Sequence, residues 1–404
     1  MATTAAERPK HQPGFATVLA QVSAAHAVSH FHIMTLPALI PFLPDRFGLS
    51  FIEIGFAITV FSLVSLLVHI PLGLMTDRLG PRPMLIAGLL LGSASFASLS
   101  LFQSQGWLLL AMAAAGLANG VYHPAGYALL AAQIEAGKVG RAFSIFTFVG
   151  FFGTAITPPI LYWTVVKAGL DVAFLTAGGI GAVVAAALLF GPGTNAAVER
   201  TPPETNALAG AISPRSVFNP AVGLLTILFL LLSLSSVGIH NFSVSALIAG
   251  YQLDIGTANW ALTGFLFASA FGVLAGGLLA DRFSRHGYVA TGALLLTALL
   301  TAAMAATSYP AIVICIIMAS AGFFFGVIAP SRDMLVRAAA PKNFEGRVFG
   351  VVSTGFNAGG VIGPILFGAL LDRGQPHLVF ALVTLLILTA VALAFVQEFL
   401  RRTR

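Results

Sequence analysis

The chain of 404 residues is 58% hydrophobic and only 8% charged, whereas a soluble domain carries roughly 25% charged residues. This composition excludes a soluble globular protein and predicts a chain folded inside a membrane. A single cysteine, Cys315, excludes an intrachain disulfide. No GxxxxGK(S/T) phosphate-binding loop occurs, which argues against ATP-driven transport, and we expect no cofactor.

Long stretches without Lys, Arg, Asp or Glu follow one another along the chain, and a membrane crossing needs about 20 apolar residues. Backbone groups inside lipid must be satisfied within the segment, so these stretches are predicted to be helices rather than strands. In chain order the predicted spans cover residues 15–43, 52–76, 84–102, 107–134, 141–165, 172–191, 219–250, 257–280, 287–306, 311–338, 346–370 and 377–398. The fold class expected is an all-α membrane protein with 12 transmembrane helices.

A segment rich in Pro, Asn, Thr and charge divides these spans into two sets of six. We therefore expect a cytoplasmic tail at 1–14, an N-terminal six-helix bundle at 15–191, a cytoplasmic linker at 192–218, and a C-terminal six-helix bundle with a short cytoplasmic tail at 219–404.

The basic residues predict the orientation. With both termini in the cytoplasm, every Lys and Arg except Arg46, Lys167 and Arg373 falls on the inner side. The net charge of +6 then reflects membrane orientation, and no nucleic-acid partner is expected. The first 14 residues are polar and lack the apolar core of a signal peptide.

Two connectors between spans nearly repeat each other about 204 residues apart, which indicates that the two halves are related by duplication. In each, an apolar run ends on an Asp-Arg pair followed by further basic residues. A carboxylate at this position can bind the N-terminus of a neighbouring helix, and the arginines can pair with acids or lipid phosphates. We interpret the connectors as gates of the inner side; the alternative is charge that only fixes the orientation. The gating residues predicted are Gly73, Asp77, Arg78, Gly80 and Arg82 in the first connector, and Asp281, Arg282 and Arg285 in the second.

The repeat continues in the fifth and eleventh spans, where Gly153 and Pro158 match Gly359 and Pro364 at a separation of 206 residues. Together with Gly363, these residues are predicted to bend helices that move.

Polar side chains inside spans are costly in lipid and usually face a cavity or another helix. In the first span His26 and His30 share a face, while His32 points elsewhere. In the fourth span Asn119, His123 and Tyr127 form a stripe at four-residue spacing.

Histidine ionises near neutral pH, so His26, His30 and His123 could carry a coupling proton and, once charged, attract an anion. In that case substrate affinity should change between about pH 5.5 and 8. The alternative is a neutral histidine bonded to a neighbouring helix. His69 is interpreted as packing, and a metal site at His26, His30 and His32 is not expected, since zinc sites usually add Cys or carboxylate ligands.

The second half carries its own polar residues. His240 continues a polar stripe with Asn241 beside it, and Asn357 lies in the eleventh span. Arg332 could bind an anionic substrate group through its planar fork, helped by Asn357. The alternative is a neutral pair of Arg332 with Asp333, although adjacent helical residues point about 100° apart.

The first connector, Gly73-x-x-x-Asp77-Arg78-x-Gly80-x-Arg82, resembles the signature loop of the major facilitator superfamily, and its second copy lies where that family has one. Gly359-x-x-x-Gly363-Pro364 resembles the Gly-Pro element of the family's exporters. The His-Pro pair at 123–124 and the histidine-rich first span are most similar to the fosmidomycin-resistance group of bacterial exporters. Thr157 stands where the exporter element usually has Gly, and the exporters' fourth-span arginine is absent.

The resemblance implies the major facilitator fold of two six-helix bundles, with the first, fourth, seventh and tenth spans lining a central cavity. It implies a monomer in the bacterial inner membrane that exports a small polar or anionic organic compound or drug by proton-coupled alternating access. The partners would be this substrate, protons and the lipid bilayer. A proton symporter for a small metabolite is the alternative within transport. An intramembrane lipid-modifying enzyme is less favoured, because the polar residues spread over both repeats.

Overall fold

The computed structural model describes residues 15–133, 139–191, 220–283, 285–340 and 345–402, and every regular element within these ranges is a helix. The predicted tail at 1–14 and the linker at 192–218 lie outside them. The first half consists of α1 (Phe15–Leu39), η1 (Ile40–Phe42), α2 (Leu43–Phe47), α3 (Phe51–Leu79), α4 (Pro81–Ser98), α5 (Gln105–Gln133), α6 (Val139–Ala168) and α7 (Leu170–Phe190). The second half consists of α8 (Pro220–Tyr251), α9 (Ile255–Arg282), α10 (His286–Ala306), α11 (Ala311–Ala339), α12 (Glu345–Asp372) and α13 (His377–Arg402).

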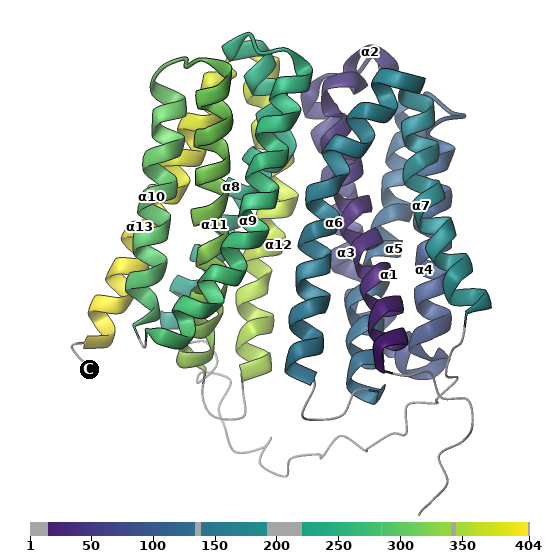
Figure 1. Ribbon diagram of the computed structural model, residues 1–404, viewed down its shortest axis with the longest axis horizontal. Helices are drawn as coiled ribbons and strands as arrows, with labels where there is room; N and C mark the ends of the chain where they lie inside the picture. Colours follow the sequence, from purple (N-terminus) through teal and green to yellow (C-terminus); the bar gives the residue numbers. More distant parts are fainter. Residues whose placement is uncertain (1–14, 134–138, 192–219, 284, 341–344, 403–404) are drawn as a thin grey trace, which may run out of the picture.

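The predicted all-α membrane fold is confirmed. Within the described ranges, 11 helical segments are long and apolar enough to cross a membrane. The remaining long helix, α4, has 18 residues, which corresponds to about 27 Å at the rise of an α-helix. It also stands in the bundle, packed against α5 and α7. Figure 1 shows the two halves as two bundles side by side.

The same packing pattern occurs in both halves. In the first half α1 packs on α6, α3 on α5, and α4 on α7; in the second, α8 packs on α12, α9 on α11, and α10 on α13. These are corresponding pairs, so the duplication expected from the two connectors extends to the helix packing.

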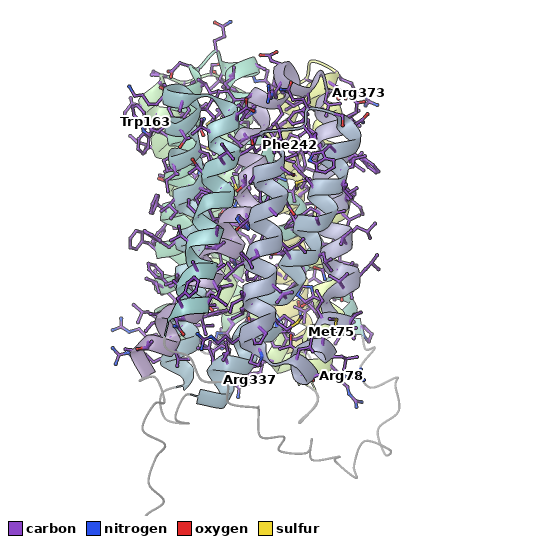
Figure 2. The ribbon with its side chains drawn as sticks, turned by 90° about the vertical axis from the view of Figure 1, so that its right-hand side faces the viewer. Met75, Arg78, Trp163, Phe242, Arg337 and Arg373 are labelled. Carbon is purple, nitrogen blue, oxygen red and sulfur yellow. The ribbon has the colours of Figure 1, made fainter. Side chains whose placement is uncertain are left out.

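Both described chain ends lie at the same end of the molecule, at the bottom of Figure 1. We call this the lower end and the opposite one the upper end. Figure 2 places Arg78 and Arg337 at the lower end and Arg373 at the upper end. Helices α3 and α9 both begin at the upper end, and each begins with a capped first turn. Ser50 and Glu53 form a capping box on α3, and Asp254 caps α9 by accepting from the Thr257 backbone N–H at 2.9 Å.

The two halves touch mainly through α3 against α12 and α6 against α9. The closest described contacts of α3 with α12 lie in the upper half of both helices. Thr59 Oγ1 donates to the Val361 carbonyl at 2.7 Å, and a Cβ on Gly55 would collide with the Pro364 carbonyl. The upper end is therefore closed between α3 and α12, while the charged connectors at the lower end stay exposed.

Candidate functional site

Two helices of the first half bring three histidines together. His26 and His30 lie one helical turn apart on α1, and His123 comes from α5. Ring centroids are 4.6 Å apart for His26 and His30, and 5.2 Å apart for His26 and His123. One nitrogen from each ring lies within 4.8 Å of the other two. We call these three residues the histidine cluster.

Helix α6 fixes two of the three rings. His26 Nδ1 lies 2.8 Å from the Phe146 carbonyl oxygen, and its ring stacks on the Phe146 ring at a centroid distance of 3.8 Å. Because a carbonyl oxygen can only accept, Nδ1 of His26 carries a hydrogen and donates it. His30 Nδ1 lies 2.9 Å from Thr154 Oγ1. Between these positions is Gly150, where a Cβ would come 2.5 Å from His26 Cε1 and 3.1 Å from His30 Cδ2. Glycine therefore makes room for both rings.

Two nitrogens of the cluster are left without a partner. His26 Nε2 and His123 Nδ1 are buried and have no hydrogen-bond partner among the described residues. An unsatisfied buried polar atom costs about 1–3 kcal/mol. The two nitrogens are therefore positioned to take up a proton or to bind a polar group.

The other two histidines of this half behave differently from each other. His69 on α3, which the sequence suggested was packing, lies beside the cluster with its ring centroid 6.3 Å from that of His123. Its Nδ1 donates to the Ser65 carbonyl at 2.9 Å. His32 points away from the cluster, and its Nε2 donates to the Ala177 carbonyl at 3.0 Å.

The rest of the fourth-span stripe borders the cluster. Asn119 bridges three helices, since its Oδ1 accepts from Ser29 Oγ on α1 at 3.1 Å and its Nδ2 donates to Ser65 Oγ on α3 at 2.8 Å. The ring of Tyr127 lies 5.6 Å from that of His123, and the Tyr127 side chain is exposed. Asn119 therefore ties the cluster's helices together, while Tyr127 lies at its accessible edge.

The histidine cluster is the only group of at least three potential metal-ligating side chains within the described ranges. Nitrogens bound to one tetrahedral zinc ion would lie about 3.3 Å apart, since each Zn–N bond is about 2.0 Å. The cluster would have to contract to reach that spacing, and no carboxylate or thiolate joins it among these residues. The set considered from the sequence, with His32 as a ligand, is not assembled. That no metal binds remains a prediction.

In the second half, Arg332 and Asp333 pair directly, which is the alternative that the sequence left open. Arg332 Nε and Nη2 each lie 2.9 Å from Asp333 Oδ1. The flexible Arg332 side chain bends back far enough to overcome the difference in direction. Its guanidinium also lies over the Phe229 ring of α8, 4.4 Å from the centroid. The pair is partly exposed, with side-chain exposures of 21% for Arg332 and 47% for Asp333.

The remaining candidates of the second half stand apart from this pair. His240 Nδ1 lies 3.3 Å from Ser236 Oγ, while His240 Nε2 is buried without a partner among the described residues. Asn241 is buried, and Asn357 is partly buried on α12. No described contact joins Asn357 to Arg332, so their joint action on a substrate stays a proposal.

The charged connectors are exposed. Asp77, Arg78, Asp281 and Arg282 all have exposed side chains at the lower ends of α3 and α9, as does Arg285 just beyond α9. None of the described hydrogen bonds ties these connectors across the two halves at the lower end. That these connectors gate the lower end remains a prediction.

Arg82 bonds to a neighbouring helix of its own half. It donates to the carbonyls of Leu188 and Gly191 at the C-terminus of α7, with 2.8 Å to Gly191. A cation there is favourable because the C-terminal end of a helix is electronegative. Gly80 joins α3 to α4 with φ +90°, a conformation that disfavours other residues.

The glycines predicted to bend helices lie at close helix contacts. A Cβ on Gly153 would collide with the Ala27 backbone of α1, and one on Gly359 would come 2.5 Å from Ser233 Cβ of α8. Gly363 faces Val237 of α8 in the same way. Pro158 and Pro364 lie inside α6 and α12. The structure thus gives these glycines a packing role, and bending in a moving helix remains a prediction.

Sequence reasoning missed residues that border the histidine cluster and the Arg332–Asp333 pair. His69 did carry a signal, because an ionisable residue inside a span is a functional candidate by default. Phe146, Thr154 and Phe229 carried none, since an apolar residue or a threonine in a long apolar run gives no sign of what it touches.

Comparisons with known proteins agree with this architecture. The family model for the Major Facilitator Superfamily matches residues 22–248 and 226–403. The Fosmidomycin resistance protein of Escherichia coli (strain K12) is 27% identical over 98% of this chain and 97% of its own length. The Multidrug resistance protein MdtH of Aeromonas hydrophila is 25% identical over 83% of both chains.

Solved structures share the fold at low sequence identity. A bacterial homologue of the human lysosomal transporter Spinster, in an inward-facing and unoccupied conformation, has a TM-score of 0.79 at 14% identity, over 95% of this chain and 96% of that chain. The nucleoside transporter NupG has a TM-score of 0.78 at 12% identity, over 94% of this chain and 99% of that chain.

Proposed function

The chain belongs to the Major Facilitator Superfamily, and from this premise we propose that it exports a small polar or anionic organic compound or drug in exchange for protons, by alternating access. As a member of this family it is a membrane transporter and not an enzyme, which removes the lipid-modifying alternative. Export is favoured over uptake because relatives that match most of the chain are named for fosmidomycin resistance and multidrug resistance.

The histidine cluster is the observation that best supports proton coupling. It places three imidazoles from two helices within 4.8 Å, nitrogen to nitrogen, and leaves two buried nitrogens without described partners. Imidazole is the side chain that changes charge near neutral pH. The alternative, neutral histidines that only join helices, accounts for the Nδ1 bonds of His26 and His30 but not for the unpartnered nitrogens.

The Arg332–Asp333 pair is the proposed contact for an anionic group. Among the described residues, one carboxylate oxygen binds the guanidinium, which offers five N–H donors, so donors remain for a ligand. The position over Phe229 holds the planar group in place without consuming these donors. We assign the proton to the first half and the anionic group to the second.

The lower end is the proposed cytoplasmic side of the bacterial inner membrane. Basic side chains gather there at Arg78, Arg82, Arg282, Arg285 and Arg337, whereas Arg46, Lys167 and Arg373 belong to the upper end. A cytoplasmic excess of Lys and Arg is the general rule for short loops. The α3–α12 contact closed above and the connectors exposed below support an inward-facing state, and we propose that the protein works as a monomer.

Proton symport of a metabolite is the second candidate, and the sign of the proton linkage separates the two. An imidazolium attracts an anion, so symport requires affinity to rise as the pH falls. Exchange requires the protonated cluster to disfavour the substrate-bound state, so that affinity weakens as the pH falls. The two candidates therefore predict opposite slopes for substrate affinity plotted against pH.

The test uses purified protein, first with fosmidomycin and then with organic acids, phosphonates, sugars and cationic drugs. A binder raises the melting temperature by mass action, so a screen at two pH values identifies both the class of substrate and the sign. In proteoliposomes, an imposed pH gradient should drive uphill movement of the hit. Binding that is equal at both pH values, with no movement under the gradient, would exclude proton coupling.

A further inference from the structure

Helix α3 begins in one half of the molecule and is capped by a carboxylate from the other half. Asp372, the last residue of α12, accepts from the backbone N–H of Phe51 with Oδ1 and from that of Ile52 with Oδ2, both at 2.8 Å. Phe51 and Ile52 are the first two residues of α3. The first N–H groups of a helix have no partner within it, and the positive end of the helix favours a negative charge.

This contact differs from the ordinary cap of the same helix. Ser50 and Glu53 already form a capping box, in which Ser50 Oγ accepts from the Glu53 N–H at 3.3 Å. That box leaves the amides of Phe51 and Ile52 for Asp372. The start of α3 is therefore satisfied completely only while α12 stays beside it.

Asp372 lies at the upper edge of a tight seam between the two halves. A Cβ on Gly368 would lie 2.5 Å from the Phe51 carbonyl oxygen, and Gly55 packs as closely on the Pro364 backbone lower down the seam. For the upper end to open, α3 and α12 must separate, and the two amides must exchange the Asp372 carboxylate for water.

The equivalent seam of the other helix pair lacks this bridge. Asp254, which begins α9 as Ser50 begins α3, accepts from the backbone and side chain of Thr257 and thus caps its own helix. The residue 206 positions before Asp372 is Val166 on α6, which carries no acceptor in its side chain. Within the part of the chain that the structure describes, the cross-half cap is thus present on one of the two seams.

We propose that Asp372 is the latch of the upper end, a residue whose bonds to α3 favour the conformation closed on that side. The proposal rests on alternating access but not on the assignment of proton or substrate. When the latch is absent, the upper-open conformation becomes more populated, because the closed one loses two hydrogen bonds while the open one loses none.

The experiment measures the equilibrium directly in the full chain without substrate, in a Cys315→Ser background. The distance between spin labels at Gln103 and Ser308, both exposed at the upper end, reports opening of that end. Labels at Leu79 and Phe283, both exposed at the lower end, report the matching closure.

Asp372→Ala should increase the ratio of upper-open to upper-closed molecules roughly fivefold, the size of a typical lost N-cap. Asp372→Asn should act in the same direction, because it keeps only one acceptor and no charge. Asp254→Ala is the matched control, since it removes an N-cap carboxylate without crossing between halves, and it should leave both distance distributions unchanged.

Distance distributions of both Asp372 variants equal to those of the unmutated chain would overturn the proposal. So would an equal shift in Asp254→Ala, because the effect would then be general loss of helix capping. No proton gradient or ligand enters the measurement, so an error in the proposed substrate or coupling ion leaves the result interpretable.

Discussion

Replacing one imidazole of the histidine cluster tests the proton assignment most directly. Two imidazolium ions at the observed 4.6–5.2 Å repel by about 3 kcal/mol at an effective dielectric constant of 20. That energy corresponds to about two pH units, so the cluster takes up no more than one proton near neutral pH. Substrate binding coupled to a single proton changes affinity by at most tenfold per pH unit, or about 300-fold between pH 5.5 and 8.

The variants are His30→Gln and His123→Gln, in which the amide keeps hydrogen bonding but cannot be protonated. Each should flatten the dependence of substrate affinity on pH, measured by thermal shift or calorimetry in detergent. His32→Gln is the control, because His32 is a buried histidine of the same helix that bonds to Ala177 instead of the cluster. It should lower the melting temperature and keep the pH profile.

Two results would refute this reasoning. A wild-type slope near a hundredfold per pH unit would mean that two protons move together, against the repulsion calculated from the ring separation. Alternatively, both cluster variants could keep the wild-type profile and still support uphill transport. Histidine would then not be the carrier, and Asp333 would be the next candidate.

Substitutions at three other positions test the second half, the lower gate and the packing. Arg332→Lys should weaken binding of an anionic substrate about tenfold and Arg332→Ala further, because Lys keeps the charge without the fork; equal affinity in all three proteins, by calorimetry, would exclude the contact. Asp77→Asn should slow transport in proteoliposomes with no change in melting temperature, because Asp77 is exposed in this state; full transport at matched expression would leave only a role in orientation. Asn119→Ala should lower the free energy of unfolding by about 1–2 kcal/mol, since it removes two interhelical bonds, to Ser29 and Ser65; an unchanged unfolding midpoint would show that neither bond contributes.

The sequence was sufficient for the features that depend on one helix at a time. The lengths of the uncharged stretches predicted the spans, because each apolar segment in lipid must form the hydrogen bonds of its own backbone. The four-residue spacing of His26 and His30 predicted their shared face. In the structure both rings lie beside His123 and Gly150. Helix α4 starts at Pro81, three residues before the predicted start at residue 84. Pro is well suited to the first turn of a helix, and Arg82 in that turn binds the end of α7, a contact that the sequence did not reveal.

Features that depend on which helices meet could not be read from the sequence. The approach of His69 to His123 requires α3 to pack on α5, and no spacing within either segment encodes that neighbour. Helical geometry left open whether Arg332 and Asp333 pair, and the structure shows that the long flexible side chain reaches the adjacent carboxylate. Asp372 gave no signal, because a carboxylate at the end of a span resembles any other interfacial charge until α3 is placed beside it.

The arrangement of these residues identifies α3 as the element that connects the separate sites. Its lower end carries Asp77, its middle places His69 beside the cluster, and its first turn is held by Asp372 of the other half. The proposed proton site and the proposed anion site lie in different halves, so their coupling has to pass between the halves. A continuous helix of 29 residues that touches the cluster, the upper seam and the lower connector offers a mechanical route instead. We therefore expect protonation to act by moving α3 against α5, which changes the fit of α3 to α12 at the upper end.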